Sequence, residues 1–123
     1  MRQILVVDDS EVMHSFMRLL LTKKKDCQVR FLKNGQEALE MARVFLPDLI
    51  LLDLSMPVMN GLEAACALKR EMPMTPIIVF SEYGDVLSEQ EARSTGISAV
   101  VSKTDSLTIL LDRARSVFYP LAA

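Results

Sequence analysis

Short hydrophobic runs alternate along the chain with longer stretches in which hydrophobic residues recur at helical spacing. Continuous runs of this kind are typical of strands that are buried on both faces of a parallel sheet. One further segment alternates between hydrophobic and polar residues, as an edge strand does. The pattern therefore predicts five strands, at residues 4–7, 27–32, 49–52, 77–80 and 99–101.

Five helices are predicted between and after these strands, around residues 12–20, 38–45, 62–69, 85–95 and 107–118. Ser10 is suited to cap the first helix, Pro47 stops the second, the third ends before Pro73, and Gly96 closes the fourth. Strands that alternate with helices predict an α/β fold with one doubly wound parallel sheet. We expect a single domain over residues 1–123.

The composition excludes several classes of protein. Half of the 123 residues are hydrophobic and 24% are charged, which argues against a disordered tail. The net charge of −2 offers no general attraction to nucleic acid, and the hydrophobic runs are too short for membrane insertion. The two cysteines form no CxxC motif, so we expect a reduced, cytoplasmic chain.

Polar residues that can carry chemistry follow four of the predicted strands: Asp8, Asp9, Asp53, Ser81 and Lys103. Sites in open parallel sheets form at the carboxyl ends of the strands, so these side chains should converge. Crowded carboxylates favour a bound cation, and oxygen ligands suit Mg²⁺. One such residue alone would be interpreted as a turn residue or a helix cap. Together, the carboxylates, the hydroxyl and the lysine match the requirements of phosphoryl transfer to a carboxylate.

With these motifs the sequence resembles the receiver domain of bacterial two-component response regulators, of the single-domain, chemotaxis-regulator type. The resemblance runs from Arg2 to about Phe118. The matching segments are ILVVDDS at residues 4–10, PDLILLDLSMP at 47–57 and MNGL at 59–62, with Ser81 and Lys103 completing the set. It implies a five-stranded parallel sheet in the flavodoxin-like order 2-1-3-4-5, with five helices.

The resemblance also implies roles for individual residues. Asp53 would accept a phosphoryl group from the phosphohistidine of a histidine kinase or a histidine phosphotransfer protein. Asp8 and Asp9 would hold Mg²⁺ together with Asp53 and the backbone carbonyl of Ser55, with Mn²⁺ as an alternative ion. The implied product is an aspartyl phosphate, so the chain would be a phosphoprotein of a two-component phosphorelay.

Ser81 and Lys103 would sense the phosphoryl group and reposition the surface formed by the fourth helix, fifth strand and fifth helix, which a downstream protein would bind. Three residues depart from the family pattern around this pair. Glu82 replaces a small residue, Val100 replaces an aromatic one, and Thr104 replaces a proline. The missing proline predicts a trans bond between Lys103 and Thr104.

Two alternatives remain beside a phospho-accepting signalling module. A degenerate receiver would bind partners without being phosphorylated. A phosphoaspartate phosphatase-type enzyme would want a second acid two residues after Asp53, where Ser55 stands. We expect no separate enzymatic activity, only assistance to its own phosphotransfer and dephosphorylation, and no direct contact with nucleic acid. Only residues 119–123 follow the last helix, which favours a stand-alone module. His14 is expected to be a solvated or partly covered surface residue rather than a phosphotransfer residue.

Overall fold

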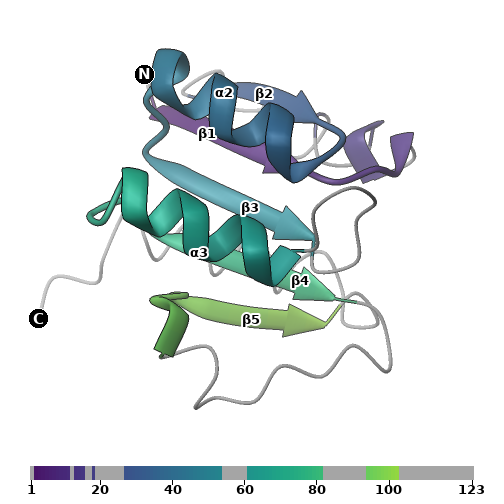
Figure 1. Cartoon of the computed structure of the whole chain (residues 1–123). Coiled ribbons are helices and arrows are strands. Elements are labelled where there is room, and N and C mark those ends of the chain that lie inside the picture. The colour runs from purple at the N-terminus through teal and green to yellow at the C-terminus, as the bar shows by residue number, and fades with distance from the viewer. Residues whose placement is uncertain are drawn as a thin grey trace, which may run out of the picture.

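The computed structural model describes residues 2–11, 13–15, 18, 27–53, 61–81 and 94–102. Its centre is one parallel sheet with the strand order β2-β1-β3-β4-β5 (Figure 1). The strands are β1 (Arg2–Val7), β2 (Cys27–Leu32), β3 (Leu49–Asp53), β4 (Ile77–Ser81) and β5 (Ala99–Ser102). This is the predicted α/β sheet in the predicted order, with β2 at an edge.

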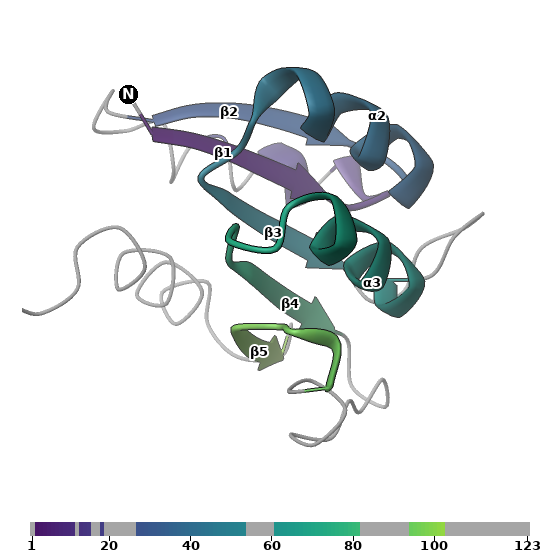
Figure 2. The same cartoon turned by 60° about the vertical axis from the view of Figure 1, so that its left-hand side comes forward.

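Two complete helices, α2 (Gly35–Phe45) and α3 (Gly61–Glu71), lie side by side on one face of the sheet (Figure 2). Parts of two further predicted helices are described: Glu11, residues 13–15 and Arg18 are helical, and so are residues 94–95. Gly96 follows the latter with a φ of 80°, which confirms it as the predicted stop. The fifth predicted helix, at residues 107–118, lies outside the described residues.

Helix α2 ends where the sequence predicts, at Phe45, but begins at Gly35, before the predicted start at residue 38. The Asn34 side chain accepts a hydrogen bond of 2.9 Å from the Glu37 N–H, which satisfies one of the donors left over in the first turn. Leu46 then adopts a left-handed conformation with φ 52°, and its N–H donates to the Ala42 carbonyl at 3.0 Å. Pro47 follows directly and cannot continue the helix.

Both faces of the sheet are buried at β1, β3 and β4, as the continuous hydrophobic runs predict. One face packs on the small and hydrophobic residues of α2 and α3, and this core comprises Leu5, Val7, Ala38, Ala42, Phe45, Ile50, Leu52, Ala64, Ala65, Leu68, Ile77, Val79 and Ile97. The alternate strand residues Ile4, Val6, Leu49, Leu51, Ile78 and Phe80 are buried as well. None of the described helices is long and apolar enough to cross a membrane.

Candidate functional site

Parallel pairing places two aspartates next to each other at the carboxyl edge of the sheet. Asp53 is the last residue of β3 and Asp8 directly follows β1, while Val7 and Leu52 are paired in register. The side chains of Asp8 and Asp53 are 0% and 1% exposed, whereas Asp9 is exposed. The predicted convergence of these three aspartates is therefore present in the structure.

The three carboxylates form a cluster that could hold a metal ion. Each of Asp8, Asp9 and Asp53 offers one oxygen, and these oxygens all lie within 4.8 Å of one another. The Oδ2 atoms of Asp8 and Asp53 are closed off from solvent. Burying negative charge is costly unless positive charge balances it, and an all-oxygen donor set suits a hard divalent cation. The residues present thus fit Mg²⁺ or Mn²⁺.

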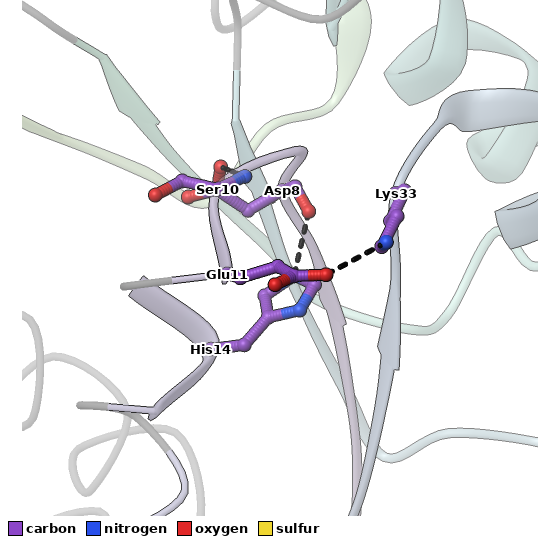
Figure 3. A network of polar contacts seen from close by, with 5 residues as sticks. All are labelled: Asp8, Ser10, Glu11, His14 and Lys33. Atoms are coloured by element: carbon purple, nitrogen blue, oxygen red, sulfur yellow. Dashed lines mark hydrogen bonds and ion pairs between the residues drawn. The ribbon is translucent and has the colours of Figure 1, made fainter.

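Asp8 is held by contacts from three directions. Its backbone N–H donates to the Leu32 carbonyl of β2 at 2.9 Å, and its Oδ1 accepts from the Ser10 N–H at 2.9 Å. Its carbonyl accepts from Nε2 of His14 at 2.5 Å (Figure 3). Ser10 also caps the first helical segment, because its Oγ accepts from the Met13 N–H at 3.3 Å. The predicted cap is therefore confirmed.

The expectation of a surface position for His14 is wrong. Its side chain is only 9% exposed, and its ring packs against Phe31 of β2 with centroids 5.1 Å apart. Phe31 pairs with Val6 of β1 and so lies on the sheet face opposite to α2 and α3. No spacing in the sequence indicated this burial, because it depends on Phe31 from another strand and on the Asp8 carbonyl.

An exposed ion pair, which the sequence did not indicate, borders the site. Nζ of Lys33 lies 3.0 Å from Oε1 of Glu11 and joins the loop after β2 to the start of the first helical segment (Figure 3). The hydrogen bond from Lys33, followed by its charge, holds the pKa of Glu11 below its usual value. The pair adds a second connection between this helical segment and β2.

The other predicted site residues are only partly within the described chain. Ser81 ends β4 and is paired with Ser102 of β5, so its backbone lies at the same carboxyl edge as Asp53. Lys103 comes directly after Ser102. Lys103 and Ser55 lie outside the described residues, as do Glu82, Thr104 and the bond between Lys103 and Thr104.

Comparison with known proteins gives the family. The protein-family model for the response regulator receiver domain matches residues 4–115 of the chain. The chain is 32% identical to the polar-differentiation response regulator DivK of Brucella anthropi, covering 94% of each chain. It is 29% identical to the chemotaxis protein CheY of Halobacterium salinarum, covering 94% of this chain and 96% of that protein. The response regulator domain of Thermotoga maritima CheB superposes with a TM-score of 0.80 at 30% identity, covering 94% and 95% of the two chains.

The chain therefore belongs to the response regulator receiver domain family of two-component systems. Some curated relatives are longer. The chain spans 54% of the transcriptional regulatory protein LnrK of Bacillus subtilis and 31% of a protein-glutamate methylesterase of Carboxydothermus hydrogenoformans. The same kind of domain thus occurs alone and as one part of larger proteins.

Proposed function

We propose that this receiver domain is a phospho-accepting signalling module whose phosphoacceptor is Asp53. The observation that carries the proposal is the cluster of Asp8, Asp9 and Asp53 at the carboxyl edge of the sheet, with their oxygens within 4.8 Å of one another. The donor of the phosphoryl group is the phosphohistidine of a histidine kinase or a histidine phosphotransfer protein. Family membership supports both parts of the proposal.

Asp53 acts as the nucleophile in this proposal: it is 1% exposed and ends the central strand β3, which lies between β4 and β1, the strand that the other two aspartates follow. A carboxylate oxygen of Asp53 attacks phosphorus and the bond between phosphorus and the histidine nitrogen breaks. An aspartyl phosphate forms, and the imidazole leaves as a neutral ring that carries a proton on its other nitrogen. The strand fixes the direction of attack, which favours transfer. Burial keeps the carboxylate out of bulk water, so nearby charges act on it strongly.

Asp8 and Asp9 would hold Mg²⁺, or Mn²⁺, together with Asp53 and the backbone carbonyl of Ser55. When bound, the ion supplies positive charge that offsets the charge of the phosphoryl oxygens. Lys103 would add a second positive charge, and the Ser81 hydroxyl would donate a hydrogen bond to a phosphoryl oxygen. The module has no separate substrate, and it assists its own phosphotransfer and dephosphorylation.

Phosphorylation would change the surface formed by β5 and by the predicted fourth and fifth helices, which precede and follow β5 in the sequence. Lys103 follows β5 directly, so a lysine drawn toward a phosphoryl group on Asp53 pulls on the end of that strand. A downstream protein would bind this surface differently before and after phosphorylation. Val100 lies inside β5, where the family pattern has an aromatic residue. The structural response to phosphorylation would therefore depend on Lys103 and Ser81.

Intact-mass spectrometry after incubation with acetyl phosphate and Mg²⁺ tests the proposal. The parent chain should gain one phosphoryl group, which hydroxylamine removes as it does other acyl phosphates. Asp53→Asn should gain none. Asp48→Asn is the matched control because Asp48 precedes the first residue of β3 and Asp53 is its last, so the two lie at opposite ends of one strand.

The three possible results of this experiment distinguish the three function classes. A stable single adduct that depends on Asp53 supports the receiver function. A folded parent chain that binds the ion but gains no phosphoryl group is a degenerate receiver, and the proposal fails. Rapid continuous release of phosphate from acetyl phosphate, without a detectable adduct, indicates a phosphatase-type enzyme.

A further inference from the structure

Three buried polar or charged side chains occur in the described part of the chain, and they lie together. Two are Asp8 and Asp53, which belong to the proposed metal site, and the third is His14. The proposed phosphotransfer does not use His14. A buried imidazole is costly unless its polar atoms are satisfied, so its contacts indicate what it does there.

The ring of His14 has a defined orientation and a defined proton. A carbonyl oxygen can only accept, so the 2.5 Å contact with the Asp8 carbonyl requires a proton on Nε2 of His14. The ring lies against Phe31, and the guanidinium carbon of Arg18 lies 4.9 Å from the centroid of that phenyl ring. The His14 backbone N–H donates to the Ser10 carbonyl at 3.2 Å. Contacts with Ser10, with Phe31 of β2 and with the Asp8 carbonyl thus fix the orientation of the His14 imidazole.

The oxygen that His14 holds belongs to the peptide unit between Asp8 and Asp9. A peptide unit is planar, so fixing its oxygen fixes the rotation of Asp8 about ψ and of Asp9 about φ. Those two rotations set the directions in which both side chains leave the backbone, and the side-chain torsions then place the carboxylates. The hydrogen bond from His14 to the Asp8 carbonyl (Figure 3) therefore acts on two of the three carboxylates of the cluster.

We propose that His14 is a positioning residue for the divalent-metal site: its Nε2–H bond to the Asp8 carbonyl orients the carboxylates of Asp8 and Asp9 and thereby sets the metal affinity. The inference rests on the proposed metal-dependent function. It does not give His14 a place among the metal ligands. It differs from a purely structural role, in which the imidazole only fills space against Phe31.

Three sets of variants separate these roles. His14→Leu and His14→Met keep a side chain of similar size but have no hydrogen-bond donor. His14→Gln has an Nε2 donor at the end of its side chain and should restore the contact. Phe31→Leu disturbs the packing of the ring and leaves the His14 donor in place. The midpoint of urea unfolding without metal gives the structural cost of each change.

Metal affinity is measured by titrating the protein with Mn²⁺ and following the electron paramagnetic resonance signal of the free ion. The chain has no tryptophan to report binding by fluorescence. His14→Leu and His14→Met should bind Mn²⁺ on the order of tenfold more weakly than the parent, as expected when an outer contact of a metal site is lost. His14→Gln and Phe31→Leu should bind nearly as tightly as the parent.

The rise in the urea midpoint on adding Mg²⁺ gives a second measurement for any variant that is only marginally folded, because binding to the folded state alone stabilises it. That rise should be smallest for the two donor-free variants. If His14→Leu and His14→Met match the parent in both measurements, or if His14→Gln is as weak as they are, the inference is overturned. If the parent itself binds no Mn²⁺, the proposed function fails instead.

Discussion

Asp53 stands beside Asp8 because β1 and β3 are parallel neighbours in which Val7 is paired with Leu52. The residue after each of this pair is therefore an aspartate at the carboxyl edge of the sheet: Asp8 directly follows β1, and Asp53 is the last residue of β3. A shift of the register by one residue would separate the two carboxylates and turn one of them to the other face. The buried hydrophobic residues before each aspartate oppose such a shift, so the core of the fold also aligns the site.

Removal of one carboxylate from the cluster should weaken metal binding. In Asp9→Ala, a site with few protein ligands loses one of three negative charges, so Mn²⁺ affinity should fall by about tenfold or more. Titration followed by the resonance signal of free Mn²⁺ measures the change. Glu40→Gln removes the same charge from an exposed position on α2 and should leave affinity nearly unchanged. Equal losses in both variants would point to general charge rather than to a site.

Local patterns were sufficient to predict most of the described fold. Hydrophobic runs marked the strands, and Pro47 and Gly96 marked helix ends. Both features can be predicted because buried strands and helix ends each require particular residue types at adjacent positions. Asp8 and Asp53 could be predicted as site residues for the same reason, since each comes at the end of such a run. Their proximity then follows from the rule that parallel strands share a carboxyl edge.

The position of His14 could not be predicted in this way. Its burial depends on Phe31, which comes from another strand, and on the carbonyl of Asp8, which carries no signature in the sequence. The ion pairs of Glu11 with Lys33 and of Arg43 with Glu71 are also tertiary contacts between distant segments. Periodicity shows which face of an element is buried but not which neighbour covers it.

The packing of α3 on the sheet should depend strongly on Leu68. Its side chain is fully buried in the core between α3 and the sheet. Leu68→Ala removes buried methyl groups and leaves a cavity, so the free energy of unfolding should fall by about 2–5 kcal/mol. Urea unfolding followed by circular dichroism measures this loss. Met74→Ala, at a side chain that is 91% exposed, should change little, and a comparable loss there would contradict the assignment of the core.

Gly96 should tolerate substitution poorly because its φ is 80°. Residues with a Cβ are strained in this region by about 1–2 kcal/mol, so Gly96→Ala should lower the free energy of unfolding by that amount. The added Cβ would also meet Cγ and Cδ of Lys69 at 3.3 Å. The Lys69 stem cannot move freely, since its Nζ donates to the Thr75 carbonyl at 2.6 Å.

Gly96→Asn separates the two causes. Asparagine adopts the left-handed conformation more readily than alanine but carries the same Cβ. If the backbone conformation dominates, Gly96→Asn should cost clearly less than Gly96→Ala in urea unfolding. Equal losses would assign the effect to the contact with Lys69 and contradict the prediction.

The ion pair between α2 and α3 should make a contribution to stability that depends on pH. Nη2 of Arg43 lies 2.8 Å from Oε1 of Glu71, with the side chains 57% and 39% exposed. The hydrogen bond from Arg43, followed by its charge, lowers the pKa of Glu71 from 4.5. A carboxyl whose pKa is lower in the folded state binds protons less readily there, so the pair stabilises the fold above pH 4.5. This stabilisation is lost as the pH falls through the folded pKa.

The free energies of unfolding of the parent and Arg43→Met, measured in urea from neutral to acidic pH, test this dependence. Arg43→Met should be modestly less stable at neutral pH, and the difference should disappear in acid as Glu71 becomes protonated. Added salt should reduce the difference at neutral pH, because the pair is exposed and its charges are screened. Glu71→Gln and the double variant complete a cycle that isolates the pairwise interaction from the packing of the arginine stem. A difference that persists unchanged at low pH would assign the effect of Arg43 to that packing and not to its charge.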